Sequence, residues 1–367
     1  MAFSLPNKSK PPADLFSARL ESALAFLHLH WKNLTNYAPG DANTLIGLPN
    51  PYIVPATPRA EFTFQEQYYW DSYFTAIGYN GPDAPAMIEG MLENLTHLLD
   101  RFGMIPSANR MYFTSRSQPP LLTSYIFHVY DTQQKSIEWL HDYIVRAHNE
   151  YRDVWMSDHH PHWRSVGGLN RYYDINALHD LAEAESGWDM TTRFERKCLD
   201  YLPIDLNALL FRYETDFARA SEIFNDQQSR NEWLEVAQRR KEWVDSVMWN
   251  TSKGMYFDYN YIKRSASGVW SLASYYPLWA GMASLEQAAA MVRNLSKFLQ
   301  KGGLTATSRP VVDMSIFGSV KTQWAYPNGW APLHFMVTEG LERYGYSKEA
   351  SQIALLWLGT NLDWFER

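Results

Sequence analysis

Helical periodicity recurs along nearly the whole chain of 367 residues and limits its possible folds most strongly. Apolar residues return at three- and four-residue spacing from Leu15 to Trp31, and again from Met87 to Phe102. Asp83 and Gly103 flank the second stretch as a helix start and a helix stop. The same pattern predicts further helices over 71–80, 118–131, 133–155, 175–186, 205–226, 229–249, 271–281, 284–300, 329–345 and 348–366. Strand-like alternation is short, as in 255–261.

Several of these helices are apolar on more than one side, which predicts an inner helical layer covered by an outer one. The helix that opens at Asp205, for example, carries Leu206, Leu209 and Phe211. The predicted number of helices, about twelve, is larger than a four-helix bundle needs. It suits an all-α, two-layer toroid of six hairpins, an (α/α)6 barrel. No linker or charge block divides the chain, so we expect a single domain over 1–367, with 1–14 as a flexible N-terminal segment.

Composition excludes several classes of protein. Aromatic residues make up 15% of the chain, which rules out a disordered or fibrous protein. The 33 Lys and Arg against 40 Asp and Glu give a net charge of −7, so we expect no nucleic-acid partner. The single cysteine, Cys198, excludes an intramolecular disulfide framework. No apolar run approaches the about 18 residues of a membrane span, and the N-terminus lacks a signal sequence. We therefore expect a cytoplasmic protein without a membrane partner, of unknown oligomeric state.

One loop places a tryptophan next to a carboxylate. Trp70 and Asp71 lie between Tyr68 and Tyr73, and this composition suits a sugar. The apolar face of the sugar ring packs on the aromatic side chain, while the carboxylate accepts hydrogen bonds from the hydroxyl groups. The residues alone also allow a buried helix start in which Asp71 is the cap.

A second loop, 185–194, repeats the Trp-Asp pair after a glycine. Gly187 allows a sharp turn, and the neighbouring Trp188 can desolvate Asp189. Desolvation raises the pKa of a carboxyl group, so Asp189 could remain protonated as a general acid. The alternative is that Asp189 caps a helix and pairs with Arg193 four residues later.

Two further segments carry sugar-binding residue types. Segment 105–120 contains hydrogen-bond donors in Asn109, Arg116 and Gln118, and segment 323–333 contains Trp324 and Trp330 among Pro and Gly residues. Taken alone, the first is more often a structural loop and the second a packed start of a helix.

Together, these segments resemble the trehalase family. Phe64-x-Glu66-x-Tyr68-x-Trp70-Asp71-x-Tyr73 resembles its first signature and Gln323-Trp-Ala-Tyr-Pro-Asn-Gly-Trp330 its second. Between them, further matches follow in the family's order: Asn109-Arg110, 115–120, 185–189, 205–209, 254–259, 277–281 and 302–304. The resemblance implies an inverting glycoside hydrolase with an (α/α)6 barrel, which splits an α-glucoside, typically α,α-trehalose, without a metal or other cofactor.

The resemblance also implies roles for individual residues. Asp189 resembles the general acid that protonates the glycosidic oxygen. The pocket for the attacked glucose is implied for Phe64, Tyr68, Trp70, Asp71 and Gln118, beside the Gly187 backbone. Further sugar contacts are implied for Asn109, Arg116 and Trp324. An inverting mechanism also requires a second carboxylate as base, separated from the acid by room for one water.

The chain departs from the family pattern on the side of the leaving group. Thr63 stands where the family carries an arginine, and the arginine- and glutamate-bearing segment usual after Asp174 is absent. Ala325 stands where an aspartate is usual. The first two of these three departures weaken the leaving-group side. The second sugar could therefore be held differently, or the substrate could be another α-glucoside, such as a glucosylglycerate-type compound.

A second departure concerns the base. The family's base is a glutamate in a Gly-Gly-Glu-Tyr loop, and we find no equivalent before Arg367. A shortened chain, a base from elsewhere, or an inactive sugar-binding homologue would explain this, and we favour the first. A shortened chain would leave the toroid open and an apolar seam poorly covered: Leu355, Leu356, Leu358 and Leu362.

A metal site is not expected. The segment 158–162 contains metal-ligating residue types in Asp158, His159, His160 and His162. Adjacent histidines rarely converge on one ion without further ligands, so a surface loop is the favoured interpretation.

Overall fold

The computed structural model describes residues 13–56, 63–310, 318 and 322–367, so most of the expected flexible segment 1–14 lies outside the described residues. The helices are α1 (Ala13–Leu34), α2 (Tyr69–Gly78), α3 (Ala84–Phe102), α4 (Leu122–Gln133), α5 (Ile137–Glu150), α6 (His179–Glu185), α7 (Ile204–Ile223), α8 (Gln227–Met248), α9 (Tyr276–Ala280), α10 (Leu285–Arg293), α11 (Ala331–Arg343) and α12 (Ser347–Phe365). Every predicted helix is therefore present, and most ends differ by a few residues. The prediction over 284–300 is wrong in its last part, because α10 ends at Arg293 and a 3-10 turn, η5 (Leu295–Lys297), and a strand at Leu299–Gln300 follow.

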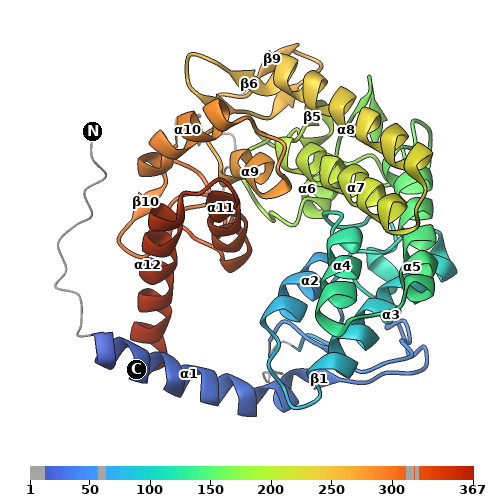
Figure 1. Cartoon of the computed structure of the whole chain (residues 1–367), viewed down its shortest axis with the longest axis vertical. Coiled ribbons are helices and arrows are strands. Elements are labelled where there is room, and N and C mark those ends of the chain that lie inside the picture. The colour runs from blue at the N-terminus through green and yellow to red at the C-terminus, as the bar shows by residue number, and fades with distance from the viewer. Residues whose placement is uncertain (1–12, 57–62, 311–317, 319–321) are drawn as a thin grey trace.

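The helices form a ring of two layers (Figure 1). The inner layer consists of α2, α4, α7, α9 and α11, and each contacts the next in this order. The ring closes where Phe335 of α11 meets Phe74 of α2, with ring centroids 5.8 Å apart. Outside lie α3, α5, α8, α10 and α12, while α1 runs across from α12 toward the strand β1 (Thr35–Asn36) (Figure 1). The predicted two-layer helical toroid is confirmed, and the described residues supply five of the six predicted pairs of inner and outer helices.

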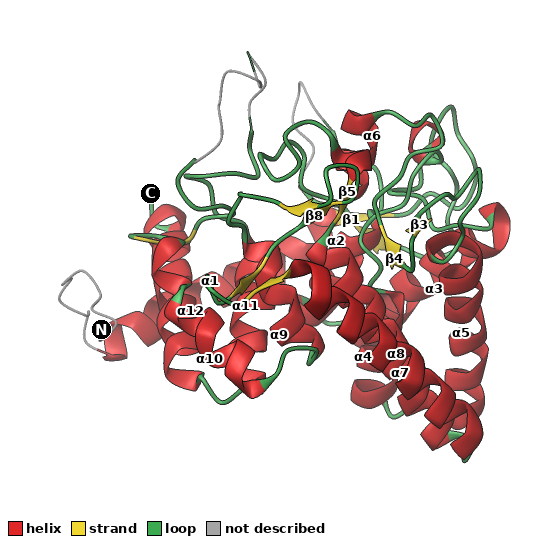
Figure 2. Cartoon of the chain, turned by 90° about the horizontal axis from the view of Figure 1, so that it is seen from above, coloured by secondary structure: helices red, strands yellow, loops and turns green. Residues whose placement is uncertain are grey.

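The loops and short strands gather on one face of this ring (Figure 2). The strands are β1 (Thr35–Asn36), β2 (Tyr52–Ile53), β3 (Ser165–Val166), β4 (Leu169–Asn170), β5 (Tyr201–Leu202), β6 (Trp249–Asn250), β7 (Met255–Tyr256), β8 (Tyr259–Asn260), β9 (Ser265–Ala266), β10 (Leu299–Gln300) and β11 (Gly303–Leu304). All pair antiparallel, in two-stranded ladders except for the three-stranded order β5-β8-β9. The motif loops lie at the N-terminal ends of the inner helices, for example Trp70 at the start of α2.

Local sequence explains several helix ends. Gly103 ends α3 in the left-handed conformation at φ 70°, as predicted. Asp83 precedes α3 without capping it, because its carboxylate accepts a hydrogen bond from the Tyr79 hydroxyl instead. A capping box of Ser284 and Gln287 begins α10. The stretch predicted as one helix over 133–155 divides into α5 and a π-helical turn, η2 (Tyr151–Trp155).

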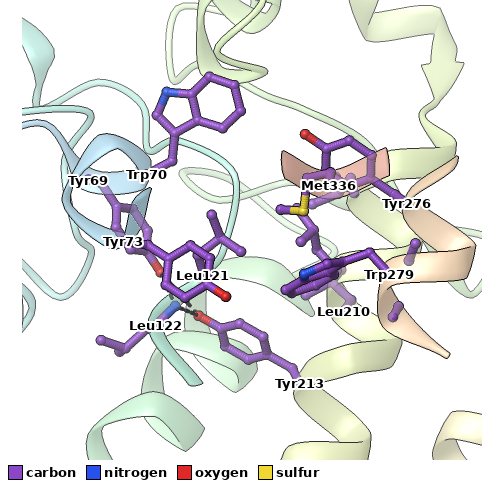
Figure 3. Packing of buried hydrophobic residues seen from close by; sticks show 14 of the residues in the cluster. Tyr69, Trp70, Tyr73, Leu121, Leu122, Leu210, Tyr213, Tyr276, Trp279 and Met336 are labelled. Atoms are coloured by element: carbon purple, nitrogen blue, oxygen red, sulfur yellow. Dashed lines mark hydrogen bonds between the residues drawn. The ribbon is translucent and has the colours of Figure 1, made fainter. Parts of the chain in front are cut away.

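Buried tyrosines connect the inner helices below the motif loops (Figure 3). The Tyr213 hydroxyl of α7 accepts a hydrogen bond from the Leu122 N–H of α4 and lies 3.0 Å from the Tyr69 hydroxyl of α2. Tyr213 also donates to the Glu150 carboxylate of α5 at 2.8 Å. Since all four residues are buried, this network fixes α2, α4, α5 and α7 relative to one another and thus places Trp70 and Asp71.

The outer side formed by α1 and α12 is much less buried. No residue of α1 from 15 to 34 is buried, and Leu24 in its predicted apolar stripe is 45% exposed. In the predicted seam of α12, Leu355 and Leu358 are 43% and 37% exposed, whereas Leu362 is buried. Arg19 joins the two helices through ion pairs with Asp363 and Glu366.

No helix in the described part of the chain is long and apolar enough to cross a membrane. The same part contains no group of three or more His, Cys, Asp or Glu side chains that could hold a metal ion, and His159 and His160 are exposed.

Candidate active site

Four tryptophans from three motif segments meet on the loop face. Trp324 lies at their centre, with its ring centroid 5.7 Å from Trp70 and 5.7 Å from Trp188. Trp330 stacks on Trp324 at 4.3 Å with an interplanar angle of 5°. The fold therefore brings the loops before α2, after α6 and before α11 together around one aromatic cluster.

The backbone of the loop that carries Asp189 is held on both sides of that residue. The Trp188 N–H donates to the Ser186 hydroxyl at 3.1 Å, and the Thr191 N–H donates to the Glu183 carboxylate at 2.9 Å. The Met190 carbonyl accepts a hydrogen bond of 3.0 Å from the Trp324 N–H. Asp189 thus has a fixed backbone next to the tryptophan cluster.

The side chain of Asp189, in contrast, makes no hydrogen bond to any residue in the described ranges. Its Oδ1 is a buried atom without a partner. Burial raises the pKa of Asp189 to about 6, and the positive charge of Arg116 opposes this rise. A half-buried carboxylate with one buried oxygen that has no partner and with a pKa near neutrality is suited to proton transfer.

The alternative pairing of Asp189 with Arg193 is wrong. The Arg193 guanidinium binds Asp205 and Asp258, and no helix begins at Asp189. Asp205 and Asp258 lie 12 and 65 residues from Arg193 in the sequence, so a three- or four-residue helical spacing could not indicate them.

The first motif loop lies against the same cluster. The Trp70 N–H donates to the Gln118 side-chain carbonyl at 3.1 Å, which leaves the Gln118 amide nitrogen without a hydrogen bond among the described residues. Gly187 has φ 73°, and a Cβ there would lie 2.6 Å from the Trp70 ring. Only glycine fits this contact. Burial raises the pKa of Asp71 to about 6, and the negative charge of Asp189 adds to the rise. The alternative of Asp71 as a helix cap is not observed, because the N-cap of α2 is Tyr68.

An aromatic row continues from this loop toward Arg116. The Phe64 and Tyr68 rings lie 6.1 Å apart, and Tyr68 lies 5.8 Å from Phe113. The Arg116 guanidinium lies 5.3 Å from the Phe113 centroid and 3.5 Å from Asp174. Sequence reasoning missed Phe113, although it lies between Asn109 and Arg116.

Asn109 is completely buried, and its side-chain amide is used within the protein. Its Oδ1 accepts from the Gln67 N–H at 2.8 Å, and its Nδ2 donates to the Ile46 carbonyl at 2.7 Å. These bonds hold the first motif loop to the segment 46–48. A direct sugar contact from Asn109 stays a prediction.

Glu185 is a buried residue with several hydrogen-bond and ion-pair partners, and the sequence analysis assigned it no role. Its carboxylate accepts from the Ser117 N–H and the Tyr173 N–H, both at 2.7 Å, and forms an ion pair with the buried Arg164. Glu185 therefore joins the loop that carries Arg116 and Gln118 to the helix before Asp189. Its position four residues before Asp189 in the motif was the only available signal.

An aromatic wall, a carboxylate of raised pKa and a nearby arginine on the loop face of an (α/α)6 toroid are features of carbohydrate-processing enzymes. A sequence profile described as Trehalase matches residues 6–185 and 177–367, and the chain belongs to the trehalase family.

Individual proteins that are similar to the chain are named as trehalases. The chain is 33% identical to the cytosolic neutral trehalase of Neurospora crassa, over 84% of this chain and 50% of that protein. It is 32% identical to the periplasmic trehalase of Xanthomonas axonopodis pv. citri, over 92% of this chain and 65% of that protein. The chain spans about half to two thirds of the length of these relatives.

Solved structures show the same fold. The neutral trehalase of Saccharomyces cerevisiae superposes with a TM-score of 0.76 at 29% identity, covering 86% of this chain and 68% of that one. A mannosylglycerate hydrolase of Thermus thermophilus has a TM-score of 0.65 at 18% identity, covering 91% and 90%. At this identity, the second likeness concerns the fold alone.

Proposed function

We propose that this site hydrolyses the α-glucosidic bond of α,α-trehalose with inversion, and that Asp189 is its general acid. The unbonded carboxylate of Asp189 beside four tryptophans carries this proposal. The relatives named as trehalases support the choice of substrate. A cytosolic location is part of the proposal and follows the Neurospora relative, although the Xanthomonas relative is periplasmic.

In the proposed reaction, a water molecule attacks the anomeric carbon from the face opposite the leaving sugar. The bond from this carbon to the glycosidic oxygen breaks, and Asp189 transfers its proton to that oxygen. The water oxygen forms the new bond and loses its proton to a base. One α-glucose and one β-glucose result, because only the attacked carbon inverts.

The pocket residues have complementary tasks in this proposal. Phe64, Tyr68, Trp70 and Trp324 supply apolar walls for the sugar ring, and Asp71 with the free amide of Gln118 binds hydroxyl groups. Gly187 admits the Trp70 ring, and Arg116 stabilises the Asp189 carboxylate after proton transfer. Asn109 holds the loop in place.

We assign none of the described carboxylates as the base. The negative charge of Asp189 adds to the raised pKa values of Asp71 and Glu183. Asp71 is assigned to the sugar, however, and Glu183 accepts the Thr191 N–H. An inverting base must also stand far enough from the acid for a water to fit between them. Asp189 is thus the one reacting group that the proposal names.

Glucose release from α,α-trehalose tests the proposal, with NMR of the first products to distinguish the two anomers. We expect equal initial amounts of α- and β-glucose, and only α-glucose would contradict inversion. Saccharide binding without hydrolysis at high protein concentration would identify an inactive homologue instead.

Thr63 in place of an arginine favours a second candidate, a related inverting α-glucosidase with a different leaving group. A panel of α-glucosides that differ in the aglycone, including a glucosylglycerate, separates the two. If kcat/KM is higher for another α-glucoside than for trehalose, that glucoside and not trehalose is the preferred substrate.

A further inference from the structure

A buried arginine lies directly behind the tryptophan that precedes Asp189. The Arg193 side chain has no exposed surface, and its two Nη atoms donate to the Asp205 carboxylate at 2.8 Å each. Its Nε and Nη2 donate to the Asp258 carboxylate at 3.1 and 2.9 Å. Two carboxylates therefore hold the guanidinium in one plane and one orientation.

The two carboxylates are themselves attached to the start of the inner helix α7. Asp205 accepts the Leu206 N–H at 3.0 Å, and Asp258 accepts the Ile204 N–H at 3.0 Å. Arg193 is thus anchored to a rigid inner helix rather than to the loop that carries it.

This anchored guanidinium lies against the indole of Trp188, 4.4 Å from the ring centroid. Trp188 is also completely buried, and its other contacts include Trp324. The backbone N–H of Trp324 in turn donates a hydrogen bond to the backbone carbonyl of Met190. The residues immediately before and after Asp189 are therefore both fixed, the first through Arg193 and the second through Trp324.

We propose that Arg193 is the positioning residue of the general acid, because it holds the Trp188 indole and thereby the orientation of the Asp189 carboxylate. This inference rests on the proposed function for the role of Asp189 as acid. In this arrangement the Asp189 side chain can keep one orientation although its Oδ1 has no hydrogen-bond partner, because the residues on either side of it are held in place. Arg193 itself touches no substrate in this account.

Arg193→Lys tests the proposal, because lysine keeps the positive charge but cannot bridge two carboxylates in one plane. Arg240→Lys is the matched control. Arg240 is also a buried arginine, paired with Glu214 at 2.7 Å and hydrogen-bonded to Asn170 at 2.8 Å, but it contacts neither Trp188 nor the Asp189 loop. Both substitutions should lower the thermal unfolding midpoint, so stability alone does not distinguish them.

Three measurements distinguish positioning from a structural role. In Arg193→Lys we expect weaker near-ultraviolet circular dichroism from the tryptophan cluster. We expect the pKa of Asp189, measured by NMR titration of isotope-labelled Asp carboxyl carbons and assigned with Asp189→Asn, to move toward its ordinary value. We also expect kcat on trehalose to fall by about 10- to 100-fold with little change in KM. Arg240→Lys should leave all three at wild-type values.

Wild-type dichroism and an unchanged Asp189 pKa in Arg193→Lys would overturn the proposal, as would equal changes in Arg240→Lys. Should Arg193→Lys fail to fold, Asp258→Asn, which retains the Asp205 pair, is expected to change the same readouts to a smaller extent. If the wild-type protein does not release glucose, dichroism and the Asp189 titration still decide the positioning role, and the proposed function fails separately.

Discussion

The loop face around Asp189 and the outer side formed by α1 and α12 are held by different kinds of contact. Around Asp189, Arg164, Glu185 and Arg193 form ion pairs that are completely buried. Along α1 no residue from 15 to 34 is buried, and the carboxylates that pair with Arg19 are about half exposed in water. Buried polar groups have few alternative partners, so these ion pairs hold the segments around Asp189 in place. On the α1–α12 side, water can replace the contacts of exposed side chains. The order of the site therefore comes from the loops and inner helices.

The largest expected effect concerns Glu185. Glu185→Gln leaves the Arg164 guanidinium buried without its countercharge, so we expect the free energy of unfolding to fall by about 3–5 kcal/mol. Urea unfolding at pH 7 measures this loss. The matched control is the exposed Glu232 of α8, where the same substitution should change stability by less than about 0.5 kcal/mol. Similar small losses in both variants would show that the buried pair does not hold the loops.

Leucine truncation compares the two regions directly. Leu95 of α3 is completely buried, and Leu95→Ala should lower the free energy of unfolding by about 2–5 kcal/mol. Leu24 of α1 already contacts water, so Leu24→Ala should cost no more than about 0.5 kcal/mol. A loss at Leu24 as large as that at Leu95 would mean that α1 is buried in solution, for instance in an oligomer.

A smaller, pH-dependent effect is expected at Asp189. Because its pKa of about 6 in the folded protein exceeds the ordinary 3.8, the folded state binds this proton more tightly than the unfolded state. Asp189 therefore contributes a loss of stability as the pH rises from about 4 to above 6, and Asp189→Asn removes this contribution while those of other carboxyl groups, such as Asp71, remain. We expect the variant to be more stable than wild type by about 3 kcal/mol above pH 7, since each pKa unit corresponds to about 1.4 kcal/mol, and close to wild type below pH 4. A difference that grows toward low pH would contradict the raised pKa.

The helical layers were predictable because periodicity is a local property. All twelve α-helices of the described residues agree with predicted stretches. Three of the four motif loops meet through Trp70, Trp188 and Trp324, and the fourth meets Trp70 through Gln118. The apolar stripe of α1 was also recognised, but periodicity alone does not reveal whether a neighbour covers it. Leu24 shows that here it remains exposed.

The polar partners of the site could not be predicted in the same way. Asp258 lies 65 residues from Arg193, and Ser117 lies 68 residues from Glu185, so no spacing rule connects them. Helical spacing suggested Asp189 for Arg193 instead, and the fold supplied stronger partners. Asn109 likewise has the residue type of a sugar ligand, whereas its amide is used by the Gln67 N–H and the Ile46 carbonyl.

The role of Asp189 as general acid is tested most directly with two substrates, α,α-trehalose and α-D-glucosyl fluoride. Glucose is a poor leaving group that needs a proton, whereas fluoride departs with much less assistance. The account predicts that Asp189→Asn lowers kcat on trehalose by about 10²- to 10⁴-fold while largely retaining hydrolysis of the fluoride. Unchanged trehalose turnover in Asp189→Asn, or equal losses on both substrates, would contradict the assignment of Asp189 as the acid.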